Sequence, residues 1–196
     1  MYKYLSNNVP THNRFVDANI GNGKFIKYIR PSKWLINNPN AHILNVWKCI
    51  YNDPNELSNH IKSENFESTC AYGNAGLYLY QRDFENIHMN NGGFNEYYFK
   101  ENIYNVNKFM NSTQGDMTNV SITNLIDHID IHDFVYLDDR ENKHKYIVDN
   151  DYIDAIDKNG ANIMILKDNS DPELHRKFKR HNVTFLNKDK LIVTNY

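Results

Sequence analysis

Segments typical of strands and segments typical of helices alternate along this chain, and a pair of strands closes it. Runs of apolar residues predict strands at 14–20, 120–122, 132–138, 162–166, 182–186 and 191–194, with a further short apolar run at 34–36. Helical spacing and capping signals predict helices at 24–30, 40–50, 53–61, 152–158 and 172–180. Strands that alternate with helices favour a parallel sheet, and the polar turn at 187–190 makes the last two strands a hairpin. The predicted fold class is therefore α/β, mostly parallel with a C-terminal antiparallel hairpin.

The middle of the chain differs from its flanks. Residues 64–116 hold five of the eight glycines and show no apolar period. This pattern indicates an irregular insertion between regular elements. We therefore expect a core formed by 1–63 and 117–196, interrupted by an insertion at 64–116.

The composition limits the classes of protein that the chain can represent. With 40% hydrophobic residues the chain can bury a core, and its net charge of −2 argues against a surface devoted to nucleic acid. Its 32 asparagines are scattered rather than clustered, which is typical of an AT-rich genome such as that of a parasite or a large virus.

Several features bear on the compartment. Two cysteines, Cys49 and Cys70, form no disulfide framework and fit a reducing environment. No run of 18 apolar residues is present, and residues 1–10 lack the pattern of a secretory signal. We expect an intracellular protein that is not secreted and does not bind a membrane.

A glycine turn, Gly21-Asn22-Gly23, follows the first predicted strand. Such a turn lets the backbone approach a nucleotide-like ligand closely, although a plain strand-to-helix turn uses the same residues. The turn alone leaves both interpretations open, and the segments around it favour the first.

Five segments carry a resemblance to a known family. They are FVDANIGNG at 15–23, LINNPNAHILNVWK at 35–48, NGGFN at 91–95, DFVYLD at 133–138 and LIVTNY at 191–196. In this order they are similar to motifs of the DNA adenine-N6 methyltransferases of the Dam-like family, and the resemblance spans about 13–196. It implies a Rossmann-like class I methyltransferase sheet, S-adenosylmethionine as methyl donor and adenine in DNA as substrate. It also implies that 64–116 is the remnant of a target-recognition insertion.

The family's catalytic tetrapeptide, D-P-P-Y, is altered here. The resemblance places it at Asp138, Asp139, Arg140 and Glu141. In the family, the acidic side chain accepts hydrogen bonds from the exocyclic amine and the aromatic ring stacks on the extruded base. Both prolines and the aromatic ring are lost, and stacking contributes roughly 1–3 kcal/mol per base. The altered tetrapeptide predicts an inactive site.

The expected cofactor site is altered as well. The resemblance assigns cofactor binding to Asp17, Gly21, Gly23, Asn38 and Asn124. The last two replace acids, Asn19 replaces an aromatic residue, and the glycine pair expected before the first motif is missing from 1–12. Arg140 would add repulsion near the sulfonium. We expect this vestigial pocket to bind S-adenosylmethionine weakly or not at all. The alternative is that the protein's own side chains fill it, with Asn19 or Tyr97 as the candidates.

The region that would contact DNA has an unfavourable charge. Between 64 and 116 three basic residues stand against seven acidic ones. Phosphate contacts supply most of the non-specific affinity for DNA. The proline and glycine that follow F-N in the family are also missing at 96–99. We expect DNA binding to be weak or absent.

Three other clusters have both a functional and a structural interpretation. The basic run at 175–181 could contact phosphate, but it fits the solvated face of a helix. His128 and His132 have the spacing of helical metal ligands, yet they precede a strand. The acidic residues within 138–141 could bind Mg²⁺, but acidic turns at strand ends are common. We predict no metal site.

The sequence therefore leaves three hypotheses. The chain could be a methyltransferase homologue that has lost catalysis and serves a structural or interaction role, for instance in a large DNA virus. It could still methylate adenine in DNA with S-adenosylmethionine, or it could be a regulatory partner of a catalytic chain. We favour the first hypothesis, with a protein partner or a second copy of the chain as binding partner.

Overall fold

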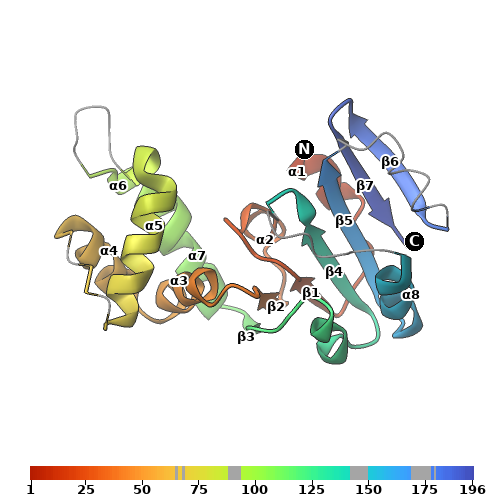
Figure 1. Cartoon of the computed structure of the whole chain (residues 1–196), viewed down its shortest axis with the longest axis horizontal. Helices are drawn as coiled ribbons and strands as arrows, with labels where there is room; N and C mark the ends of the chain where they lie inside the picture. The colour runs from red at the N-terminus through yellow and green to blue at the C-terminus, as the bar shows by residue number, and fades with distance from the viewer. Residues whose placement is uncertain (65, 68, 88–93, 142–149, 169–177, 179) are drawn as a thin grey trace. The chain divides into compact units, whose positions relative to one another are not determined.

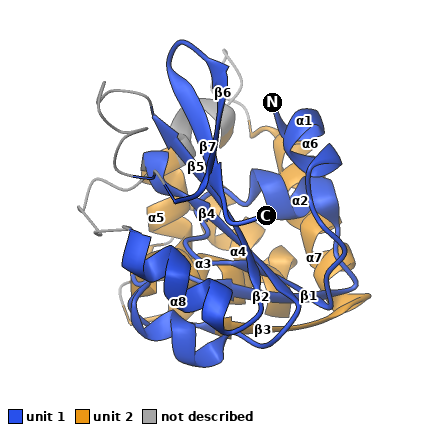
Figure 2. Ribbon diagram, turned by 90° about the vertical axis from the view of Figure 1, so that its right-hand side faces the viewer, with its two compact units in different colours: residues 1–39, 118–196 blue, residues 40–117 orange. Residues whose placement is uncertain are grey.

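The computed structural model describes the chain apart from residues 65, 68, 88–93, 142–149, 169–177 and 179 (Figure 1). It divides into two compact units: unit 1 contains 1–39 and 118–196, and unit 2 contains 40–117 (Figure 2). The assignment of 64–116 to a target-recognition insertion stays a prediction, because a division into compact units does not test that role.

Seven strands form one sheet in the order β3-β2-β1-β4-β5-β7-β6. They are β1 (Arg14–Asp17), β2 (Lys33–Asn37), β3 (Gln114–Thr118), β4 (Asp133–Asp138), β5 (Asn162–Asp168), β6 (Asn182–Asn187) and β7 (Lys190–Thr194). β1 runs parallel to β2 and β4, and β4 runs parallel to β5. β7 is antiparallel to both β5 and β6. The predicted fold class, a mostly parallel α/β sheet with a C-terminal antiparallel hairpin, is confirmed.

Side chains of the central strands alternate between the two faces of the sheet. Val16, Val135 and Ile163 belong to a core cluster that includes Ile153 and Ile156 of α8 (Asn150–Lys158). Because the alternate residues of these strands are buried too, the strands appear in the sequence as continuous apolar runs.

The alternate residues on β1 and β4 meet a second set of helices. Phe25 of α2 (Lys24–Ile29) lies with its ring centroid 5.8 Å from that of Phe15 and 4.3 Å from that of Tyr136. Leu5 of α1 (Tyr2–Asn7) is also fully buried. This face of the sheet therefore carries an aromatic core.

One predicted strand is wrong. Residues 120–122 are not a strand, and the strand in this part of the chain is β3. The backbone N–H and carbonyl of Val120 bond the side chain of Asn37 instead of a neighbouring strand. The chain then enters the short 3-10 helix η2 (Asn124–His128).

Unit 2 is helical. Its elements are α3 (Ala41–Asn52), α4 (Pro54–Lys62), α5 (Ala71–Ile87), α6 (Glu96–Phe99), the π-helical turn η1 (Lys100–Tyr104) and α7 (Asn105–Asn111). The predicted caps are confirmed: the Asn40 side chain accepts from the N–H of His42, and the Asp53 side chain accepts from those of Asn55 and Glu56.

The expectation of an irregular segment at 64–116 is wrong over most of its length. Two of the glycines that suggested it, Gly73 and Gly76, lie inside α5 rather than in turns. A Cβ on Gly73 would stand 2.4 Å from the carbonyl oxygen of Glu67, whereas one on Gly76 would make an ordinary contact of 3.4 Å with Ile61. Gly73 therefore allows a close approach of the backbone, and the position of Gly76 does not require glycine.

The remaining predicted elements differ in their outcome. The helix predicted at 152–158 is confirmed as α8, and Gly160, with a φ of 74°, follows its end. The helix predicted at 172–180 falls largely outside the described residues. Among the described residues, no helix is long and apolar enough to cross a membrane.

Candidate functional site

The carboxyl ends of β1 and β4 bring three polar side chains together. Asp17 is paired with Tyr136 in the parallel register, and Asp138 follows two residues later on the same face of β4. Asp17 and Tyr136 are buried, with 3% and 2% of their surface exposed. In open parallel sheets, ligands bind outside the carboxyl ends of the strands, so this edge is the candidate site.

The glycine turn begins directly above this edge. The Ile20 N–H donates to the Asn37 carbonyl at 2.8 Å, and the Asn22 side chain accepts from the Lys24 N–H at 3.1 Å. Gly23 is the N-cap of α2, with a φ of 62°. This left-handed conformation favours glycine and explains the residue at that position.

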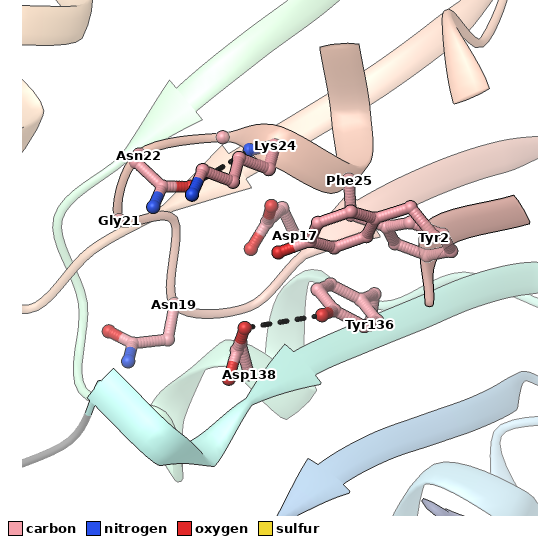
Figure 3. Close-up of a pocket in the computed structure, with 10 residues that line it drawn as sticks. Tyr2, Asp17, Asn19, Gly21, Asn22, Lys24, Phe25, Tyr136 and Asp138 are labelled. Carbon is pink, nitrogen blue, oxygen red and sulfur yellow. Dashed lines mark hydrogen bonds between the residues drawn. The ribbon is translucent and has the colours of Figure 1, made fainter. Parts of the chain in front are cut away.

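A pocket lies between the turn and the strand ends. It is lined by the glycine turn at 21–23, by the carboxylates of Asp17 and Asp138, and by the aromatic side chains of Tyr2, Phe25 and Tyr136. Figure 3 shows the two carboxylates near its middle, with aromatic rings on one side and the turn on the other. The pocket holds about 240 Å³ of empty space, part of it open to solvent.

Tyr136 contacts both the aromatic side of the pocket, through Phe25, and its carboxylate side, through Asp138. Its hydroxyl donates to Oδ2 of Asp138 at 3.4 Å. Burial raises the pKa of this hydroxyl far above its usual value, and the carboxylates of Asp138 and Asp17 raise it further. Tyr136 is therefore a neutral hydrogen-bond donor at any physiological pH and is no base.

Arg140 occupies both carboxylate oxygens of Asp138. Its Nε lies 2.8 Å from Oδ1 and its Nη2 lies 2.6 Å from Oδ2, and its backbone N–H donates to Oδ1 at 3.2 Å. The hydrogen bond to Asp138 raises the pKa of Arg140 above its usual value. The pair is largely buried, with 15% and 13% of the side chains exposed.

The other two positions of the tetrapeptide lie in the short 3-10 helix η3 (Asp139–Glu141). Asp139 forms an ion pair with Lys167 of β5. The side chain of Glu141 falls outside the described part of the structure. Three of the four predicted catalytic residues are thus placed, and Asp138 is the one that lines the pocket.

The predicted ribose-binding position has a structural partner instead. Asn38 is buried, and its Nδ2 donates to the Ile20 carbonyl at 2.6 Å. Asn124 is exposed in η2, and neither residue lines the pocket. The structure therefore brings Asp17, Gly21 and Gly23 together and leaves Asn38 and Asn124 outside.

Sequence reasoning missed four of the pocket's residues: Tyr2, Lys24, Phe25 and Tyr136. All but Tyr2 carried an available signal, since Tyr136 precedes Asp138 by two positions on a strand, and Lys24 and Phe25 start the helix after the turn. Tyr2 had no signal in the sequence. Of the two side chains expected to fill the pocket, Asn19 lines it, whereas Tyr97 is 73% exposed and fills no cavity.

The remaining candidates form no site among the residues that the structure describes. Arg180, from the basic run, pairs with Asp154 at 2.8 Å, and the buried His181 lies 3.3 Å from the same carboxylate. Most of that run falls outside the described residues. Over the part of the chain that the structure describes, no group of three or more His, Cys, Asp or Glu side chains could hold a metal ion.

Comparison with known proteins supplies the fold family. No protein-family model matches the chain, and no curated protein matches it significantly. The rRNA methyltransferase aviRa from Streptomyces viridochromogenes matches with a TM-score of 0.51 over 98% of this chain and 80% of that protein, at 10% sequence identity. The chain has a methyltransferase-like Rossmann fold. A methyltransferase from Geobacter sulfurreducens gives a TM-score of 0.45 over 99% of this chain and 75% of that protein, at 8% identity.

The methyltransferase-like fold implies S-adenosylmethionine, but the residues present do not fit this cofactor. Ligand pockets usually hold roughly 300–1,000 Å³, and this one is smaller even with its solvent-open part included. The Tyr2 side chain lines the pocket, and the amide of Asn38 is held by the Ile20 carbonyl. The pocket is partly open to solvent, but the space that it encloses in this structure is smaller than a ligand of that size.

Proposed function

We propose that this chain is a catalytically inactive member of the methyltransferase fold, a pseudoenzyme that serves a structural or interaction role. The observation that carries the proposal is the Asp138–Arg140 pair, in which both carboxylate oxygens already accept charge-assisted hydrogen bonds. By its resemblance to the D-P-P-Y motif, Asp138 would have to accept hydrogen bonds from a target amine. A carboxylate held in this way is a poor acceptor for such an amine.

Two further features support inactivity. The resemblance places the stacking ring of the tetrapeptide at position 141, where this chain has glutamate. The pocket is also smaller than the cofactor requires, with Tyr2 from α1 in its wall. Base stacking, amine recognition and cofactor binding would therefore be impaired together.

The role left to such a chain is binding rather than chemistry. The excess of acidic residues between 64 and 116 opposes contact with DNA phosphates, so we favour a protein partner or a second copy of the chain. The asparagine content fits a large DNA virus as the source. Sedimentation of the purified chain, alone and from its native source, tests whether it assembles with itself or with another protein.

The alternative function is methyl transfer, either by the chain alone or with a partner. Asp17 and the glycine turn favour it, since they line a pocket at the carboxyl edge of a methyltransferase-like sheet. The resemblance suggests adenine in DNA as the target, whereas the neighbour of similar fold is an rRNA methyltransferase. Both nucleic acids therefore belong in the assay.

Transfer of a labelled methyl group from S-adenosylmethionine tests the proposal. We expect no incorporation into double-stranded DNA, single-stranded DNA or ribosomal RNA above a reaction without protein, while an adenine methyltransferase in parallel labels DNA. The matched control is Asp138→Asn. Incorporation by the wild type that is lost in Asp138→Asn overturns the proposal, and incorporation that persists in the variant identifies a contaminant.

A further inference from the structure

The first residues of the chain touch both walls of the pocket. Tyr2 lines it, and the Tyr2 ring stacks on Phe25 with centroids 6.1 Å apart and an interplanar angle of 29°. The Sδ of Met1 lies 3.8 Å from Nη1 of Arg140. The start of α1 therefore contacts the aromatic wall through Tyr2 (Figure 3), and it contacts the residue that holds Asp138 through Met1.

Helix α1 is too short to be stable by itself. It has six residues, and isolated helices below about 12–15 residues are marginal in water. Its order depends on tertiary contacts at both ends. At the far end, Leu5 is fully buried and the carbonyl of Asn8 accepts a hydrogen bond from the hydroxyl of Tyr196 at 2.8 Å.

The pocket end is held differently. There the contacts are the partly exposed ring of Tyr2 and the guanidinium of Arg140, which also forms a hydrogen bond with Tyr2. Asp138 fixes the guanidinium plane through Nε and Nη2, which leaves Nη1 directed to Met1. The Arg140 guanidinium thus binds the Asp138 carboxylate and also contacts the start of α1.

We propose that α1 is a lid over the aromatic side of the pocket, with Tyr2 as its plug and Arg140 as its latch, so that the space beside Phe25 and Tyr136 becomes accessible to a ligand only after the pocket end of α1 moves away. This movement leaves Leu5 and Asn8 in place as the hinge side. The opened pocket presents the carboxylate of Asp17 beside the rings of Phe25 and Tyr136, which suits a compact group that carries hydrogen-bond donors. The inference rests on the proposed function in one respect: both concern the same pocket.

Hydrogen exchange measured by mass spectrometry tests the latch. Arg140→Gln removes the guanidinium, and we expect exchange in residues 2–8 to become at least tenfold faster than in the wild type. The matched control is Lys167→Gln, which breaks the neighbouring ion pair with Asp139 without touching α1. Exchange in β4 reports global unfolding and serves as the internal reference. Equal acceleration in both variants, or none in Arg140→Gln, overturns the latch.

Chemical labelling tests the plug and does not depend on Arg140. A thiol introduced by Asn19→Cys lies in the wall of the pocket. We expect a maleimide to react with it at least tenfold faster when Tyr2→Ala is added, as followed by peptide mapping. The matched control is Tyr28→Ala, which removes a half-exposed tyrosine of α2 outside the pocket. Equal rates in the two backgrounds overturn the plug.

The outcomes separate the lid from the proposed function, because neither readout involves methyl transfer. Faster exchange and labelling support the lid whether or not the chain is active. If Tyr2→Ala also transferred methyl groups to nucleic acid, the lid would stand and the proposed loss of catalysis would be wrong.

Discussion

Arg140 and Asp138 lie two residues apart in the sequence and form a bidentate ion pair, with Nε–Oδ1 and Nη2–Oδ2 distances of 2.8 and 2.6 Å. A third hydrogen bond comes from the backbone N–H of Arg140. The carboxylate that the resemblance assigns to amine recognition is therefore part of a closed intramolecular network. Such a pair stabilises the turn after β4 and removes the free acceptor that catalysis would need.

Because the two side chains pair, a single substitution should lower the free energy of unfolding more than the double substitution does. Arg140→Ala leaves the Asp138 charge largely buried without its cation, and we expect it to lower the free energy of unfolding by about 3 kcal/mol, the lower end for a buried pair. The combination of Asp138→Asn with Arg140→Gln removes both charges and should recover most of that loss. Urea unfolding of Arg140→Ala, of the double variant and of its two single substitutions measures both effects. Additive losses would show that the two side chains do not interact.

The sequence predicts the backbone of the site better than its side-chain contacts. The strand ending at Asp17 and the glycine turn follow from local patterns, and parallel register then places the carboxyl ends of β1 and β4 together. Arg140 was expected to lie near the sulfonium of the cofactor and repel it, but its guanidinium pairs with Asp138. A motif match fixes a position along the strand, whereas the partner of a side chain depends on residues far away in the chain.

The same limit explains the two asparagines after β2. The resemblance aligned Asn38 with a ribose-binding acid, yet an amide can donate where a carboxylate cannot, and Asn38 donates to the Ile20 carbonyl. Asn37 likewise joins β2 to the segment after β3. Its side chain bonds the backbone N–H and carbonyl of Val120, and these groups therefore do not pair with a neighbouring strand at 120–122. Neither contact has a local signature in the sequence.

Asn38→Asp should therefore destabilise the chain rather than restore a cofactor site. The new carboxylate would face the Ile20 carbonyl at the present 2.6 Å contact and could not donate to it while ionised. We expect a loss of about 1–3 kcal/mol in the free energy of unfolding, with no binding of S-adenosylmethionine by calorimetry. Unchanged stability together with micromolar binding would mean that Asn38 faces a latent cofactor site.

Asn37→Ala should lower the stability of the chain more than a substitution of Asn38 or Asn124. Its Nδ2 donates to the carbonyls of Ala18 and Val120, and its Oδ1 accepts from Thr118 Oγ1 and from the Val120 N–H. Asn37→Ala leaves these buried and partly buried groups without their partner, so we expect a loss of about 3 kcal/mol. Exposed Asn124→Ala is the matched control and should change stability by less than about 0.5 kcal/mol. Similar losses in both variants, measured by urea unfolding, would contradict a special role for Asn37.

The two cysteines of unit 2, Cys49 and Cys70, should differ in thiol reactivity. Burial, together with a smaller effect of the nearby Cys70, raises the pKa of the Cys49 thiol from 9.0 to about 12, so almost no thiolate forms at pH 8. Cys70 is half-buried, with its Sγ 3.9 Å from Nε2 of His60. We expect iodoacetamide at pH 8 to modify Cys70 first and to leave Cys49 unmodified until the chain unfolds, as followed by peptide mapping.

The same shift carries a dependence of stability on pH. Because the folded chain keeps the Cys49 proton up to about pH 12 while an unfolded thiol loses it near 9, the folded state binds more protons in that window. The contribution of this thiol to stability is therefore complete below pH 9 and declines as the pH rises towards 12. Cys49→Ala removes the group without introducing a charge, so its urea midpoint should fall less between pH 8 and pH 10.5 than that of the wild type. Parallel declines in the two proteins would assign the loss to other groups, such as the buried hydroxyl of Tyr136, whose pKa burial also raises.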